Sequence, residues 1–191
     1  SAIMSAIEDA GWRGVLMHFR GCGGEINRLD RGYHSGDTGD IACLFQTLRR
    51  REPETTVVAV GYSLGGNALL KYLGETGTDA EVQAAVAVSV PYLLGDCAAR
   101  LSAGFSRLYQ WRLVNSLRAK TRRKFRGRAA PFSLEALAGV RTFYQFDELV
   151  TAPLHGFAGA AEYYEKSSSR QYLGGIRVPV LLLHARDDPF M

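Results

Sequence analysis

The chain has 191 residues, 47% of them hydrophobic and 22% charged, which suits one soluble domain with a sizeable core. Its formal net charge of +4 is a local feature, because nine Lys/Arg and no acid lie between Arg107 and Arg128. Removing those nine from the total of 23 leaves 14 basic residues against 19 acidic ones, so we expect no nucleic-acid partner. No apolar run approaches the roughly 20 residues of a membrane span.

The cysteine content indicates a reducing compartment. The three cysteines, Cys22, Cys43 and Cys97, are odd in number and widely spaced. They have neither metal-ligand spacing nor the even count of a disulfide framework. The first residues also lack the pattern of a secretory signal peptide. We therefore expect a cytoplasmic protein with no metal and no other cofactor.

Taken in chain order, the first residues alternate helical and extended patterns. Residues 1–10 predict a helix, and the apolar run 14–19 predicts a short buried strand. A glycine-rich loop, 20–24, follows at the strand end where α/β sheets hold their ligands. Asp37 is placed to cap a helix that runs to about Arg51.

The rest of the chain alternates strands and helices, with one long helical stretch. We expect, in order, a strand at 57–60, a helix at 64–73, a strand at 82–90, helical segments at 94–120, 133–150 and 157–170, and a strand at 180–183. This order predicts an α/β fold with a mainly parallel sheet flanked by helices. We expect one domain over residues 1–191, with residues 91–155 inserted as a helical cap over the active-site edge.

The most informative stretch is Gly61-Tyr62-Ser63-Leu64-Gly65, which joins the β-branched run 57–60 to a helical pattern. This is a G-x-S-x-G nucleophile elbow in the strand–turn–helix context that it needs. The turn exposes the Ser63 hydroxyl, and the N–H of Leu64 is placed to bind a tetrahedral oxyanion. We expect Gly61 and Gly65 to have no room for side chains. The alternative is a Gly-rich turn that only connects strand and helix.

A nucleophilic serine needs a base and a carboxylate, in the order Ser, Asp/Glu, His for this kind of fold. Asp188 follows the last apolar strand and is the preferred acid, with the adjacent Asp187 as an alternative. The same residues also fit a plain Asp-Pro turn.

No histidine follows Asp188 in the sequence. We expect His18 and His184 to be core residues in or at the ends of buried strands. His155 is expected to lie in a turn, and only His34 lies near the ligand edge. His34 is a weak candidate for the base. We therefore expect an incomplete fold that lacks the base after Met191 and the second oxyanion donor before Ser1.

Several motifs together resemble the YheT-like branch of the α/β-hydrolase family. They are Phe19-Arg20-Gly21-Cys22-Gly23-Gly24, Arg31-Gly32-Tyr33-His34-Ser35-Gly36, the stretch 60–74 around the elbow, Ala152-Pro153-Leu154-His155-Gly156-Phe157, Ala161-Glu162-Tyr163-Tyr164 and Ala185-Arg186-Asp187-Asp188-Pro189-Phe190. The resemblance covers nearly the whole chain. It implies a carboxylic-ester hydrolase with Ser63 as nucleophile and Asp188 as triad acid. The family's histidine would fall beyond Met191.

Three functions are compatible with these features. The resemblance favours hydrolysis of a lipid ester or of a short- or medium-chain acyl ester, through an acyl-enzyme on Ser63. Acyl transfer to an alcohol uses the same nucleophile, and a non-catalytic binding module is the third hypothesis. The apolar and basic residues of 105–126 suit a lid over an acyl pocket or a contact with an anionic membrane. The alternative is a solvated basic face on a helix that packs over the body of the protein.

Overall fold

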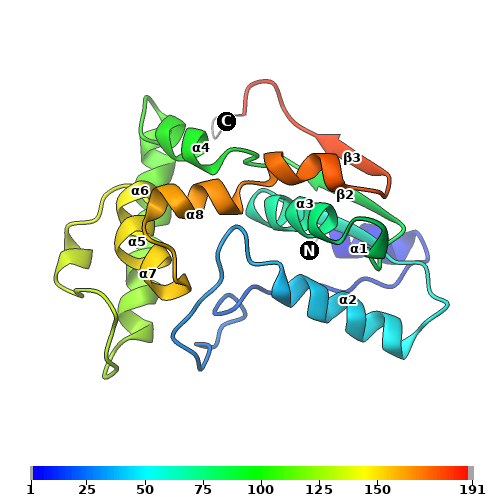
Figure 1. Cartoon of the computed structure of the whole chain (residues 1–191), viewed down its shortest axis with the longest axis horizontal. Coiled ribbons are helices and arrows are strands. Elements are labelled where there is room, and N and C mark those ends of the chain that lie inside the picture. The colour runs from blue at the N-terminus through cyan, green and yellow to red at the C-terminus, as the bar shows by residue number, and fades with distance from the viewer. Residues whose placement is uncertain (1, 189–191) are drawn as a thin grey trace.

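The computed structural model describes residues 2–188, which form three strands and a larger number of helices (Figure 1). The first elements are helix α1 (Ala2–Asp9) and, after a long irregular segment, helix α2 (Gly39–Arg51). The others follow in chain order: β1 (Val58–Tyr62), α3 (Leu64–Thr76), η1 (Gly77–Asp79), β2 (Ala84–Val88), α4 (Leu94–Leu101), α5 (Ser106–Lys124), η2 (Ala136–Ala138), α6 (Phe143–Phe146), η3 (Asp147–Thr151), α7 (Ala152–His155), α8 (Ala160–Ser167), η4 (Ser169–Gly175) and β3 (Val180–Leu183).

The three strands form one parallel sheet in the order β1-β2-β3. Val58 pairs with Ala84 at the start of the first ladder, and Val86 pairs with Leu181 in the second. Parallel neighbours need a crossover between them, and α3 supplies it for β1 and β2. The predicted parallel sheet is confirmed, and its carboxyl ends bring residues 63, 89 and 184 to one edge.

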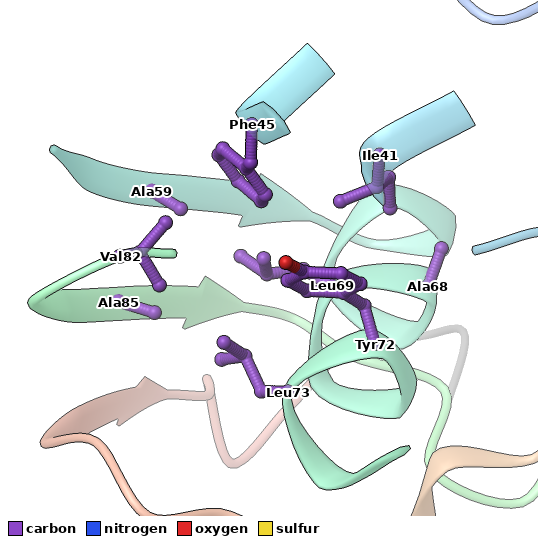
Figure 2. Packing of buried hydrophobic residues seen from close by; sticks show 9 residues of the cluster. All are labelled: Ile41, Phe45, Ala59, Ala68, Leu69, Tyr72, Leu73, Val82 and Ala85. Carbon is purple, nitrogen blue, oxygen red and sulfur yellow. The ribbon is translucent and has the colours of Figure 1, made fainter. Parts of the chain in front are cut away.

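One face of the sheet carries the main core (Figure 2). Leu69, Tyr72 and Leu73 recur on α3 at the spacing of a helix face and point at the strands. Ile41 and Phe45 of α2 point into the same cluster beside α3, with Phe45 directed toward β1. Burial of each leucine or aromatic side chain stabilises the fold by about 1.5–3 kcal/mol, so this cluster fixes the strand–turn–helix unit around residue 63.

The opposite face of the sheet is apolar and exposed among the described residues. β1 alternates between exposed and buried positions, with Val60 and Tyr62 outward at 44% and 55% exposure. Leu181 and Leu183 of β3 are exposed as well. The sequence predicted strands buried on both sides, whereas helices cover only one side here.

The strand predicted at residues 14–19 is not present. A strand requires a partner for its backbone groups, and an open groove of about 530 Å³ separates this segment from β1. Val15 and Leu16 line this groove and are exposed, at 51% and 60%. Met17 and Phe19 still pack against the main core, so part of the apolar surface of the segment is buried.

The helices between β2 and α8 lie to one side of the sheet (Figure 1). They hold a second apolar cluster, which includes Val114, Leu137 and Phe146. The predicted helix 94–120 is interrupted, because Gly104 adopts a left-handed backbone (φ +55°) between α4 and α5. The helix predicted at 133–150 is present only in its second half, where α6, η3 and α7 form one helical run from Phe143 to His155, and residues 133–142 contain only the short η2. We propose that this segment, residues 91–155, acts as a cap.

Two smaller expectations concern helices. The cap of α2 is Thr38 rather than Asp37, and no side-chain cap bond is formed there.

None of the helices within residues 2–188 combines the length and the apolarity that a membrane crossing requires.

Candidate active site

Ser63 occupies the sharp turn between β1 and α3. Its backbone lies in the left-handed region (φ +48°, ψ −120°), which costs a non-glycine residue about 1–3 kcal/mol. The Ser63 N–H donates to the carbonyl of Val88 at 2.8 Å, and the Ser63 carbonyl accepts from Asn67 at 3.0 Å. The turn is thereby fixed to β2 on one side and to the first turn of α3 on the other.

The glycines around Ser63 have different surroundings. A Cβ on Gly61 would lie 2.7 Å from the Gly65 carbonyl oxygen, so the prediction for Gly61 is confirmed. For Gly65 the prediction was wrong, since the nearest atom to a Cβ there is Phe19 Cε2 at 3.8 Å. The second tight position is Gly66, where a Cβ would lie 2.6 Å from Val90 Cγ2.

Leu64 is the first residue of α3. The first N–H groups of a helix have no acceptor within the helix, and the dipole adds partial positive charge at this end. An oxyanion formed on Ser63 would lie next to these groups. This local geometry fits the predicted oxyanion role of Leu64.

Ser63 and Leu64 line a cavity of about 550 Å³ between the sheet edge and the helices of residues 91–155. Most of its walls are apolar side chains from α4, α5 and the segment 143–154. They are Leu94, Ala98, Leu101, Leu113, Leu117, Phe125, Phe143, Phe146, Val150 and Leu154. A cavity of this volume holds a small organic ligand, and its walls suit an acyl chain.

Asp188 lies beyond the end of β3, in a turn where its N–H donates to the Ala185 carbonyl at 3.4 Å. It is half-buried, whereas Asp187 is exposed. Asp188 is not among the cavity-lining residues, but its charge acts on Cys97, which does line the cavity. Burial, then Asp96, then Asp188 raise the pKa of the Cys97 thiol to about 11. The carboxylate is therefore at the expected strand end, near the cavity wall.

His34 lines the same cavity as Ser63, but its chemistry is unsuited to a general base. Its Nδ1 accepts from the Gly36 N–H at 3.2 Å, and its ring contacts the rings of His155, Phe157 and Tyr163. Burial, followed by the charge of His155, lowers the pKa of His34 to about 3. A base of that pKa removes a serine proton poorly at neutral pH.

The other histidines differ from expectation. His18 and His184 were predicted to be core residues and are both exposed, since the segment before His18 joins no sheet and one face of β3 is uncovered. His155 ends α7 and lines the cavity. Its Nδ1 lies 2.7 Å from the Thr151 carbonyl oxygen, and its Nε2 lies 3.4 Å from that of Gly32.

A carboxylate that the sequence analysis did not single out also lines the cavity. Asp147 begins the π-helical turn η3, and its two oxygens accept from Thr151 Oγ1 at 2.6 Å and Tyr164 Oη at 2.8 Å. Burial raises its pKa to about 6, against the lowering effect of those two bonds. In the sequence, Asp147 is an acid directly after an apolar core residue, which is a weak signal.

Comparison with known proteins now places the chain. A family model described as "alpha/beta hydrolase fold" matches residues 1–191. The chain belongs to the α/β-hydrolase family. The parallel sheet, its strand order and the sharp turn between β1 and α3 agree with this assignment. Among solved structures, no significant match was found.

Within the α/β-hydrolases the chain is similar to several named proteins. It is 45% identical over 191 residues to the Escherichia coli (strain K12) protein named "Putative esterase YheT", covering 99% of this chain and 56% of that one. It is 32% identical over 183 residues to a monoacylglycerol lipase of Saccharomyces cerevisiae, covering 92% and 41%. It is 27% identical over 184 residues to the mouse phospholipase ABHD3, covering 96% and 45%. The chain thus spans about half the length of these relatives.

One buried side chain ties the elbow of this hydrolase fold to its surroundings. Asn67, on the first turn of α3, donates to the carbonyls of Ser35 (2.9 Å) and Ser167 (2.8 Å) and accepts from the Ser169 N–H (2.9 Å). It is fully buried and three of its hydrogen-bonding positions are filled. Ser35 in turn donates its N–H to Tyr163 Oη at 3.0 Å. The helix that begins after Ser63 is therefore fastened to the cavity-lining residue Ser35 and to the segment 167–169 at the end of α8.

Proposed function

We propose that the full-length protein is a serine carboxylic-ester hydrolase that acts on acyl or lipid esters through an acyl-enzyme on Ser63. The observation that carries the proposal is the left-handed backbone of Ser63 at the edge of a largely apolar cavity. A non-glycine residue keeps such a conformation only where the surroundings enforce it, and nucleophile elbows are such places. The relatives named as esterase, monoacylglycerol lipase and phospholipase support the same reaction class.

In the proposed mechanism, Ser63 Oγ attacks the ester carbonyl carbon while a histidine takes the hydroxyl proton. The N–H of Leu64 stabilises the resulting oxyanion. The bond to the alcohol oxygen then breaks, the alcohol leaves with the proton, and water releases the carboxylic acid from Ser63. Asp188 is proposed to orient the histidine.

The histidine itself requires a separate proposal. His34 is a poor base because its pKa is about 3 and its Nδ1 is engaged by Gly36. The E. coli relative is longer than the matched region. We therefore propose that the base lies in the corresponding additional part of the full-length protein, as the family resemblance implies.

The test uses full-length protein, a p-nitrophenyl hexanoate assay and covalent labelling by a fluorophosphonate, read by intact mass. Ser63→Ala is expected to abolish both hydrolysis and labelling. Ser89→Ala is the matched control, because Ser89 has the same left-handed φ of +48° at the end of β2. The control should retain both signals. Unchanged hydrolysis in Ser63→Ala would overturn the proposal.

The same assay separates the alternatives. Asp188→Asn should lower kcat far more than Asp187→Asn if Asp188 is the triad acid. With ethanol present, formation of the ethyl ester would indicate acyl transfer as well as hydrolysis. If the full-length protein shows neither turnover nor labelling, a non-catalytic binding module becomes the better description.

A further inference from the structure

The wall of the cavity formed by Asp147, Thr151 and Tyr164 has no part in the proposed reaction of Ser63. Asp147 is half-buried, and its two hydrogen bonds come from neutral hydroxyls. Within residues 2–188 it has no ion-pair partner. A carboxyl that is partly removed from water and has no cation beside it is costly to ionise, and this desolvation raises the pKa of Asp147. A group placed at such cost in the same cavity as Ser63 is a candidate for binding a ligand.

The backbone at Asp147 gives a second, independent indication. Residues 147–151 form a π-helical turn, a rare conformation that occurs often at functional sites. Pro153 accounts for the turn locally, because it has no N–H to donate to the carbonyl of residue 149 and its ring would collide with that carbonyl. The wide turn places Asp147, Val150 and Thr151 together on the cavity wall.

The carboxyl retains capacity for another hydrogen bond. Each oxygen can accept two, and Thr151 and Tyr164 use one on each. The hydroxyl of Tyr163 is engaged by the Ser35 N–H, and most of the remaining wall is apolar. A donor entering the cavity would therefore find its strongest acceptor at Asp147.

The charges around the cavity decide which donor fits. Its lining includes four basic side chains, Arg20, Lys120, Arg123 and Lys124, and Asp147 is the single acid among the lining residues. A cationic group would be repelled by the basic side chains. An anionic group has no proton to donate to the Asp147 carboxylate and is repelled at contact with it, although the four basic side chains attract an anion elsewhere in the cavity. A neutral hydroxyl is attracted to a carboxylate and carries no net charge to repel.

We propose that Asp147, held by Thr151 and Tyr164, is a subsite that accepts a hydrogen bond from a free hydroxyl on the alcohol part of the ester. The class of ligand is thus an ester of a polyol, such as a partial glyceride. The proposal rests on the cavity being the substrate site of the proposed hydrolase. Asp147 determines specificity in this scheme and takes no part in the bond-breaking steps.

The test separates binding from turnover by using Ser63→Ala full-length protein and ethers that no hydrolase cleaves. Three hexyl ethers are compared by calorimetric titration: 1-O-hexylglycerol, hexyl methyl ether and hexyl choline ether. The glycerol ether is expected to bind about tenfold more tightly than the methyl ether, the gain typical of one hydrogen bond to a charged group. The preference should disappear in Ser63→Ala/Asp147→Asn. Equal affinity for the glycerol and methyl ethers, or a preference for the choline ether, would overturn the proposal.

The matched control is Glu148→Gln, because Glu148 is the adjacent acid on the same turn and bonds the Ala160 N–H instead of lining the cavity. It should keep the tenfold preference. If Asp147→Asn fails to fold, Tyr164→Phe replaces it, since loss of one donor leaves the carboxylate poorly oriented and should reduce the preference several-fold. An unchanged preference in the foldable variant would contradict the assignment.

Turnover provides a separate readout on the otherwise wild-type enzyme. Asp147→Asn should lower kcat/KM for 1-hexanoylglycerol about tenfold and leave methyl hexanoate within twofold. An equal loss for both esters would mean that Asp147 only supports the fold. No turnover of either ester, with the ether preference intact, would refute the hydrolase proposal and leave the hydroxyl subsite standing.

Discussion

The consecutive glycines after Ser63 differ in how closely other atoms approach them. Gly66→Ala should lower the free energy of unfolding by about 2 kcal/mol, because its Cβ would collide with Val90 and the Gly61 carbonyl. Gly65→Ala should change it by less than about 1 kcal/mol, since Phe19 is at ordinary contact distance. Urea denaturation of the two full-length variants measures the difference. Equal destabilisation would contradict the packing described at the elbow.

The raised pKa of Asp147 makes a testable contribution to stability. The pKa of the Asp147 carboxyl is about 6 in the folded protein, against an ordinary value of 3.8. The associated stability, about 3 kcal/mol, is present below pH 3.8 and is lost as the pH rises through 6. The neighbouring Tyr33, Tyr163 and Tyr164 have raised pKa values and stay neutral in this window.

Asp147→Asn removes this titration. As the pH rises from 4 to 7, the wild type should therefore lose stability that the variant does not lose. The free energy of unfolding of the variant minus that of the wild type should increase over this range. Thermal or urea unfolding at several pH values measures the difference between the two proteins. A difference that does not vary with pH would mean that Asp147 ionises normally in the folded state.

Helix α5 presents two kinds of side chain to the outside. Its N-terminal end exposes Phe105, Leu108 and Trp111, with exposures of 73%, 57% and 60%. Its C-terminal end exposes several arginines and no acid. Aromatic side chains suit the interface of a bilayer, and each basic residue near an anionic surface adds about 1 kcal/mol. The membrane contact that the sequence suggested stays a prediction, and this surface is where we expect it.

Vesicle sedimentation tests the prediction for α5. Trp111→Ala should weaken binding of the full-length protein to phosphatidylglycerol vesicles several-fold. Tyr144→Ala, which removes an aromatic side chain that is 50% exposed on α6, should have no effect. Binding that is equally strong to uncharged vesicles would show that the basic residues contribute nothing.

The elements that were predicted correctly are those with local signals. The β-branched run before Gly61 and the apolar spacing after Ser63 each contain enough information to define β1 and α3. The run 14–19 has equally strong apolar character, yet it forms no strand, because a strand also depends on a partner that its own residues do not encode. Gly104 interrupts the predicted long helix through one backbone angle that the apolar pattern does not reveal.

The candidate site rests on the same kind of local signal. The roles of Ser63 and Leu64 were predicted from one motif and that of Asp188 from the end of a strand, and all three stay predictions. The tight approach at Gly66 and the cavity wall at Asp147 both arise from residues distant in sequence, Val90 in one case and Tyr164 in the other. Only the folded chain brings those pairs together.

At the scale of the whole molecule, the uncovered apolar face of the sheet has a consequence for handling the protein. This face exposes an apolar patch of the kind that drives self-association, formed by Val60, Tyr62, Leu181 and Leu183. The 191 residues produced alone should bind the dye ANS and sediment as larger species as concentration rises, more so than the full-length protein. Tyr62→Lys/Leu181→Lys should reduce both signals, and monomeric, dye-free behaviour of the unmodified chain would show that this face is covered in solution.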